Sequence, residues 1–209
     1  MSSVVQALRN IGSSNTRVGL VTVASEATQE FYLNDFTTLD GVVAALESTA
    51  FLGGDDLNLV GGLEAVQDQF EEENGERAAN VNVLVSIIDQ LPINSDSAVL
   101  EAARALQLDH RVAMFSVGIT DVIAQSNVLR HLAEELPIFE MNYFSVTSHS
   151  DLDSISSDVA SEVCDASEPI LGKATKTIAV QCMHGWRLRF SSTFCTKCFH
   201  CFNEYLQHE

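Results

Sequence analysis

The stretch VNVLVSIID, residues 81–89, is the feature that most constrains the fold of this chain. Its apolar residues are nearly continuous and mostly β-branched, whereas a strand with one solvated face alternates apolar and polar residues. Such a run is typical of a strand in a parallel sheet that helices cover on both faces. The run ends on Asp89, and open α/β sheets bind their ligands at the carboxyl ends of the strands. Asp89 is therefore the first candidate binding residue.

Segments with strand and helix patterns alternate along the chain up to residue 164. We expect strands within residues 16–25, 30–36, 81–89, 111–119 and 141–148. We expect helices within residues 2–12, 38–50, 53–70, 95–110, 126–136 and 152–164, two of which begin at an N-cap, Thr38 or Asp40 and Ser95 or Asp96. Alternation at this spacing indicates an α/β fold: a Rossmann-like, doubly wound, mainly parallel sheet flanked by helices.

The charge of the chain limits the classes of partner. Its formal net charge of −18 excludes general nucleic-acid binding, because phosphate contacts require Lys and Arg, and favours cations or basic partners. No window reaches the roughly 20 apolar residues of a membrane span, and the start, MSSVVQALRN, has no signal-peptide pattern.

The charge is also unevenly distributed. Residues 1–164 hold 25 Asp and Glu against 6 Lys and Arg, whereas residues 165–209 hold 4 against 5. This shift, together with Glu168-Pro169 and Gly172, predicts a boundary near 165–172. We therefore expect one α/β domain at 1–164 and an irregular, Cys-containing tail at 165–209, whose degree of order the sequence leaves open.

The order of the motifs resembles that of a von Willebrand factor A-type (vWA) domain. TRVGLVTVAS, EFYLNDF, FLGG, VNVLVSIID, VAMFSVGI, YFSV and the closing helix that ends in VC match that family's segments in sequence order over residues 3–164. The resemblance implies a sheet that carries a metal-ion-dependent adhesion site (MIDAS), where an acidic residue of a protein ligand completes the shell of Mg²⁺. It implies a non-enzymatic interaction or adhesion module of an extracellular matrix or cell-adhesion protein, with collagen or another matrix component as partner. The chain is then extracellular if it is part of a longer secreted parent.

In that family three loops supply the oxygen ligands of the metal: an Asp-x-Ser-x-Ser loop after the opening strand, a Thr after a Gly-Gly turn, and an Asp at the end of a middle strand. Asp89 matches the third. At the second, Leu57 stands where the pattern requires Thr, and Asp55 or Asp56 compensates only if the register shifts by a residue or two. The first loop is missing, because the chain begins within the helix that normally follows it. We therefore expect a degenerate or incomplete site, where Mg²⁺ or Ca²⁺ binding is doubtful and Asp89 acts instead as a solvated or capping carboxylate.

The resemblance also implies that the central first strand of the sheet is missing, so that the strands at 17–24 and 81–88 face a vacant position. The lost ladder hydrogen bonds, at about 1 kcal/mol each, and several buried aliphatic side chains, at about 1.5–3 kcal/mol each, rival the stability of a whole domain. Either those two strands close up, or another segment fills the position, or the sequence is an incomplete product of a longer polypeptide. We favour the third. The segment TIAVQ, residues 177–181, is a strand-like candidate for the vacant position.

All five cysteines lie in the last quarter of the chain. By the resemblance, Cys164 bridges to a cysteine upstream of the opening strand, with a free buried thiol as the alternative. In the tail, Cys195-x-x-Cys198 has the spacing of a zinc knuckle, and Cys182 with His184 could supply the other pair, although the crowded CFHC of residues 198–201 loosens the fit. A zinc-organised adaptor is accordingly the alternative function. Disulfides among Cys182, Cys195, Cys198 and Cys201, or no function at all, are the other possibilities for the tail.

The sequence contains no credible catalytic set. The glycines of LGGDDLNLVGG lack the G-x-G-x-x-G spacing of a dinucleotide loop, and Asp55 and Asp56 would repel a pyrophosphate. His110, His131 and His149 are scattered over a helix end, a helix and a loop, where we expect solvent-facing or capping roles. We therefore expect no enzyme, and a nucleotide-binding α/β enzyme is the least favoured alternative.

Overall fold

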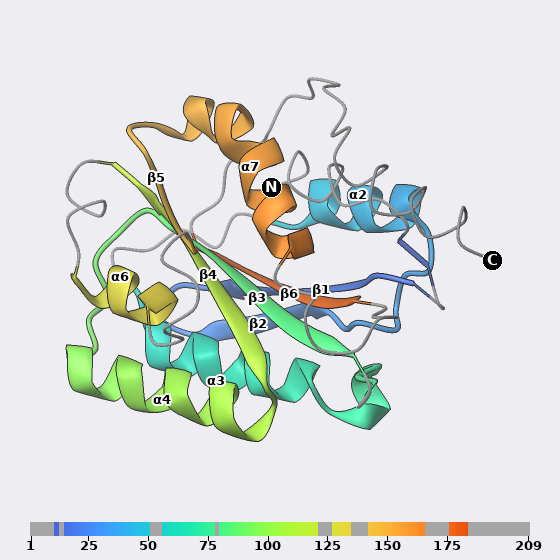
Figure 1. Ribbon diagram of the computed structural model, residues 1–209, viewed down its shortest axis with the longest axis horizontal. Helices are drawn as coiled ribbons and strands as arrows, with labels where there is room; N and C mark the ends of the chain where they lie inside the picture. Colours follow the sequence, from blue (N-terminus) through green and yellow to red (C-terminus); the bar gives the residue numbers. More distant parts are fainter. Residues whose placement is uncertain are drawn as a thin grey trace.

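The computed structural model describes residues 11–12, 15–50, 56–77, 80–120, 127–134, 142–165 and 176–183. One sheet lies between two layers of helices, with α2 and α7 on one face and α3, α4 and α6 on the other (Figure 1). None of the described helices combines the length and apolar character that crossing a bilayer requires.

The sheet has six strands in the order β2-β1-β6-β3-β4-β5. All neighbouring strands are parallel except β2, which pairs antiparallel with β1 at one edge. The strands are β1 (Arg17–Val23), β2 (Ala27–Phe31), β3 (Val81–Ile88), β4 (Val112–Ile119), β5 (Tyr143–Val146) and β6 (Lys176–Met183). The structure thus confirms the predicted α/β class and its mainly parallel sheet.

The helices begin close to where the sequence predicts. They are α2 (Leu39–Ser48), α3 (Leu59–Gln69), α4 (Asp96–Asp109), α6 (Asn127–Glu134) and α7 (Leu152–Asp165), with short 3-10 turns η1 (Glu72–Asn74) and η2 (His149–Asp151). Between the alternative caps, Thr38 caps α2 and Ser95 caps α4, because their hydroxyl oxygens accept hydrogen bonds from the amides of Gly41 and Ala98. The helix expected at 2–12 falls almost entirely outside the described residues.

The second strand lies earlier in the chain than the expected 30–36. A turn in which the Ala24 amide donates to the Glu26 carbonyl at 2.9 Å sends the chain directly back along β1. Pairing therefore begins at Ala27 and stops at Phe31, where Tyr32 enters a turn closed by the carboxylate of Asp35 at 2.7 Å. The local turns, rather than the apolar pattern, fix the limits of this strand.

The uninterrupted apolar character of β3 comes from burial on both faces. Val83, Val85 and Ile87 belong to the core that α2 and α7 cover, whereas Leu84 and Ile88 belong to the core under α3, α4 and α6. All five of these side chains are buried. A strand at the middle of a doubly covered sheet has no solvated face, which explains the run that opens the sequence analysis.

Strand β6 occupies the position expected to be vacant. Its Cα atoms pair with β1 from Arg17↔Thr177 to Val23↔Met183, and with β3 from Val81↔Lys176 to Ile87↔Cys182. Of the three alternatives, the structure therefore shows the second, in which another segment fills the sheet, and the preference for an unfilled sheet is corrected. Two facing parallel edges leave rows of unpaired N–H and C=O groups, and a strand from beyond α7 satisfies both rows. Residues 166–175 are not described, so the boundary near 165–172 stays a prediction.

Candidate functional site

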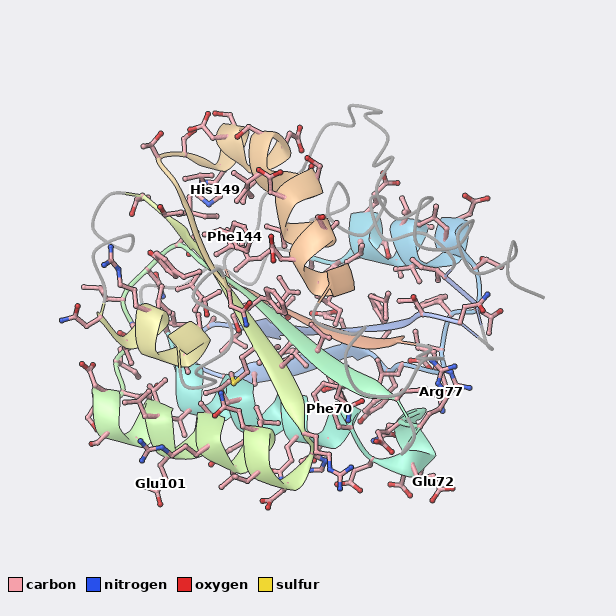
Figure 2. All side chains as sticks on the ribbon, in the orientation of Figure 1. Phe70, Glu72, Arg77, Glu101, Phe144 and His149 are labelled. Carbon is pink, nitrogen blue, oxygen red and sulfur yellow. The ribbon has the colours of Figure 1, made fainter. Side chains whose placement is uncertain are left out.

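The carboxyl ends of the parallel strands meet at one edge of the sheet, which we call the rim. Asp89 follows β3 directly, and His149 begins η2 after β5. The imidazole Nε2 of His149 donates to Asp89 Oδ2 at 3.1 Å, and the two side chains are 26% and 10% exposed. Figure 2 shows His149 between the end of β5 and α7. This contact fixes the loop after β3 to the loop after β5.

The second carboxylate oxygen of Asp89 has a different environment. Oδ1 is buried and has no hydrogen-bond partner within the described part of the chain. A buried acceptor without a donor is costly, so this oxygen favours any donor group that reaches the rim. Asp89 is thus half engaged by the protein and half available.

The turn that carries His149 is braced by its own side chains. The hydroxyls of Ser148 and Thr147 each donate to Asp151 Oδ2 at 2.8 Å. The Ser148 hydrogen bond, followed by that of Thr147, holds the pKa of Asp151 below its ordinary value. Asp151 therefore keeps its charge at neutral pH and holds η2 in one conformation.

A third loop, ahead of α3, joins the same rim through backbone and amide hydrogen bonds. The Asn58 amide donates to the carbonyl of Ala24 at the end of β1 at 2.8 Å, and the Ile93 amide donates to the carbonyl of Leu57 at 2.9 Å. The Asn94 side chain donates to Asn58 Oδ1 at 3.1 Å and accepts from the first turn of α3 at 3.2 Å. The loop after β3 is therefore held on both sides, by His149 and by the loop before α3.

Two large apolar side chains project from this fixed loop into solvent. Leu91 is 52% exposed and Ile93 is 60% exposed. Among the described residues only Leu39 and Leu108 are comparably large, apolar and exposed, and they lie on helices away from this loop. Adjacent exposed apolar residues on a rigid loop are typical of a binding surface.

The predicted metal ligands are only partly brought together. Asp89 lies at the rim as expected, Asp56 is exposed, and Asp55 lies outside the described residues. Leu57, at the position where the family pattern requires Thr, is fully buried in the core with α3 and offers no oxygen. The described residues contain no group of three His, Cys, Asp or Glu side chains placed to hold a cation. The part of the site that is described therefore does not fit a complete metal cage.

The tail ligands are mostly beyond the described chain. Cys195, Cys198 and Cys201, with His184 and His200, are not described, and of Cys182 only the backbone is, in β6 between Thr22 and Ile87. The predictions of zinc or disulfides in the tail therefore stay predictions, as does the pairing of Cys164.

The histidines show where the sequence prediction succeeded and where it missed a functional side chain. His110 is the C-cap of α4, with its amide donating to the Leu106 carbonyl at 3.1 Å, as a capping role requires. His149 was expected to face solvent or to cap a helix, but it binds Asp89. Its place shortly after the last predicted strand, at the same edge as Asp89, was the available signal.

Comparisons with known proteins agree with this architecture. The von Willebrand factor type A domain profile matches residues 1–158. The chain is 26% identical over 151 residues to the transmembrane cell adhesion receptor mua-3 of Caenorhabditis elegans, which covers 70% of this chain and 4% of the receptor. It is 30% identical over 121 residues to cochlin of Bos taurus, which covers 58% of this chain and 21% of cochlin. The chain thus spans a small part of the curated relatives it matches.

Solved structures share the fold at low sequence identity. Proximal thread matrix protein 1 from the mussel byssus, with a zinc-occupied MIDAS motif, superposes with a TM-score of 0.67 at 17% identity over 78% of this chain and 41% of that chain. The manganese-loaded TRAP protein of Plasmodium vivax superposes with a TM-score of 0.57 at 18% identity over 76% of this chain and 63% of that chain. The profile match spans β1 to β5, while β6 lies beyond it. This chain belongs to the von Willebrand factor type A domain family.

Proposed function

We propose that this domain is a non-enzymatic protein-binding module that holds its partner at the rim. The observation that carries the proposal is the exposure of Leu91 and Ile93 on a loop fixed by Asp89–His149 on one side and by Leu57–Ile93 on the other. Because the loop is already ordered, a partner loses little free energy in fixing it, and the apolar side chains are free to contribute to affinity.

The charge around this surface defines the chemistry of the partner. Asp56 and Asp153 are exposed near the ends of the rim loops, and the loop sequences DLN, DQLPINS and TSHSDLD contain no Lys or Arg. The whole chain carries a formal charge of −18. The matching partner surface has apolar side chains flanked by Lys or Arg, and its association is faster at low salt.

This binding mode does not depend on a bridging cation. The described residues offer a metal one carboxylate, Asp89, whose Oδ2 is already engaged by His149. Mg²⁺ or Ca²⁺ is therefore a minor contributor at most, and a basic group of the partner takes the position beside Asp89 Oδ1 that a cation would otherwise fill.

The relatives support an adhesive role outside the cell. Those named above include a cell adhesion receptor and a matrix protein of the byssus. We place this domain in a longer secreted or cell-surface protein, with collagen or another matrix component as the partner. A catalytic role has no support from the rim, which presents apolar and acidic side chains.

Biolayer interferometry against immobilised collagen tests the proposal. The wild-type domain is compared with the double variant Leu91→Asp, Ile93→Asp, and with Leu108→Asp as a matched control, because Leu108 is 79% exposed near the end of α4, at the other edge of the sheet. We expect the rim variant to bind at least about tenfold more weakly, the control to bind like wild type, and EDTA to change neither.

Two outcomes count against the proposal. Equal binding by the rim variant and the wild type would exclude the rim as the binding surface. Absence of wild-type binding would reject collagen as the partner.

A further inference from the structure

Strand β6 alone joins the two halves of the sheet. In the described sheet β1 and β3 do not pair with each other, and each instead pairs with β6 over its length. We call the facing backbones of β1 and β3 the acceptor position. One side of it is continuous with β2, and the other with β4 and β5.

The position of β6 in the chain sets it apart from the other strands. Strands β1 to β5 alternate with helices between residues 17 and 146, whereas β6 follows α7 and lies outside residues 1–158, which match the family profile. Figure 1 shows β6 between β1 and β3 in the middle of the sheet. Removing β6 from the acceptor position requires a change in only one connection, residues 166–175, and leaves the β1–β2 and β3–β4–β5 pairings in place.

We propose that the acceptor position is a strand-binding site that also takes β6 from a second copy of this chain, which gives a strand-exchanged dimer. In both arrangements the strand makes the same parallel ladder with β1 and β3, so the strand itself gains or loses nothing on exchange. The balance is set by the connection at 166–175 and by protein concentration, because the tethered strand has a fixed effective concentration and the second copy does not.

The occupant is a second copy because the fit is already specified at every position. Val18↔Ile178 through Val23↔Met183 on one side, and Asn82↔Thr177 through Ile87↔Cys182 on the other, run without a register shift. An unrelated peptide has to displace a strand that pairs throughout, whereas β6 of another copy offers equal pairing. Main-chain hydrogen bonds provide the affinity of such strand addition.

The test uses the full chain, unfolded in urea with a reducing agent so that the cysteines form no disulfides. It is refolded at low micromolar and at several hundred micromolar concentration, and its mass is measured by size exclusion with light scattering. We expect a dimer fraction that rises with the refolding concentration and persists after dilution. The variant Ala179→Pro, at the position paired with Gly19 and Leu84, is expected to give no dimer, because proline removes the amide that the ladder needs. Ser191→Pro, outside β6, is the control and is expected to behave like wild type.

A peptide with the sequence of residues 174–185 provides a second measurement on the wild-type chain. In excess during refolding it is expected to fill the acceptor position and to suppress the dimer, whereas the same peptide with Ala179→Pro leaves the dimer fraction unchanged. If Ala179→Pro does not fold, this arm decides. A chain that stays monomeric at every concentration overturns the proposal, and so does a dimer that Ala179→Pro retains or that the peptide does not reduce.

Discussion

Replacing Gly19 with alanine tests how closely α3 approaches the sheet. A Cβ at Gly19 would lie 2.2 Å from Gln69 Oε1 and 2.6 Å from Gln69 Cδ, which is inside van der Waals contact. Gln69 is fully buried on α3, and its Nε2 donates to the Phe31 carbonyl at 2.9 Å. The added methyl group therefore forces the amide out of its hydrogen bond or pushes the helix away from β1. Because α3 begins at Asn58, a shift of this helix is transmitted to the rim.

The magnitude follows from three contributions. Overpacking a core position costs about 1–3 kcal/mol, and a buried amide that loses its partner costs about 1–3 kcal/mol more. Alanine regains about 0.5–1 kcal/mol because it restricts the unfolded chain more than glycine does. We therefore expect Gly19→Ala to lower the free energy of unfolding by about 2–4 kcal/mol, measured by urea unfolding followed by circular dichroism.

Two further variants make the reasoning refutable. Gly12→Ala is the matched control, because its Cβ would meet the nearest atom, Asn15 Nδ2, at 3.6 Å, and we expect a change within about 0.5 kcal/mol. Gln69→Ala removes the obstacle, so the double variant Gly19→Ala, Gln69→Ala should be less destabilised than the sum of the two by at least about 1 kcal/mol. Additive effects, or a Gly19→Ala variant as stable as Gly12→Ala, would refute the account.

Three other predictions concern the rim and the edge strand. In a double-mutant cycle of Asp89→Ala and His149→Ala, we expect a coupling of about 1 kcal/mol in urea unfolding, below the about 1.5–3 kcal/mol of a fully buried charge-assisted hydrogen bond because His149 is 26% exposed; simple additivity would show that the contact contributes nothing. Titration of Mg²⁺ or Mn²⁺ by calorimetry should give the same heats for wild type and Asp89→Ala, and a heat that depends on Asp89 would instead indicate a functional metal site. Burial raises the pKa of Tyr143 from its ordinary value of 10.0, against the opposing charge of Arg130, so the folded state holds the phenolic proton more tightly than the unfolded chain does. That stability is fully present below about pH 10 and is lost as the pH rises through the folded pKa, so Tyr143→Phe should flatten the alkaline decline in urea unfolding, and an unchanged decline would contradict this assignment.

Much of the fold could be predicted because its signals are local. The run at 81–89 identifies a doubly buried strand without reference to any other part of the chain, and Thr38 and Ser95 mark helix starts through hydrogen bonds that span three residues. The order of such segments was sufficient to indicate the family. The limits of β2 were less accessible, because a single turn at Ala24–Glu26 outweighed the apolar pattern of residues 30–36.

What the sequence did not reveal depends on contacts between distant segments. His149 and Asp89 are 60 positions apart, and no local pattern distinguishes this His from one that faces solvent. The strand at 176–183 reads as a short apolar run in an irregular tail, and its place between β1 and β3 follows only from the need of both strands for a partner. The absence of the first family strand was visible in the sequence, but its replacement was not.

The direction of β6 connects the two proposals. Because β6 is parallel to β1 and β3, its last residue, Met183, pairs with Val23 at the carboxyl edge, so the chain leaves the sheet at the rim where Asp89 lies. In a strand-exchanged dimer each rim is therefore built next to a strand end of the other copy, and the dimer carries two surfaces with exposed Leu91 and Ile93. A repetitive matrix polymer that binds one such surface weakly would bind the dimer more tightly without any new contact, because the second binding event occurs at the high effective concentration that the first creates.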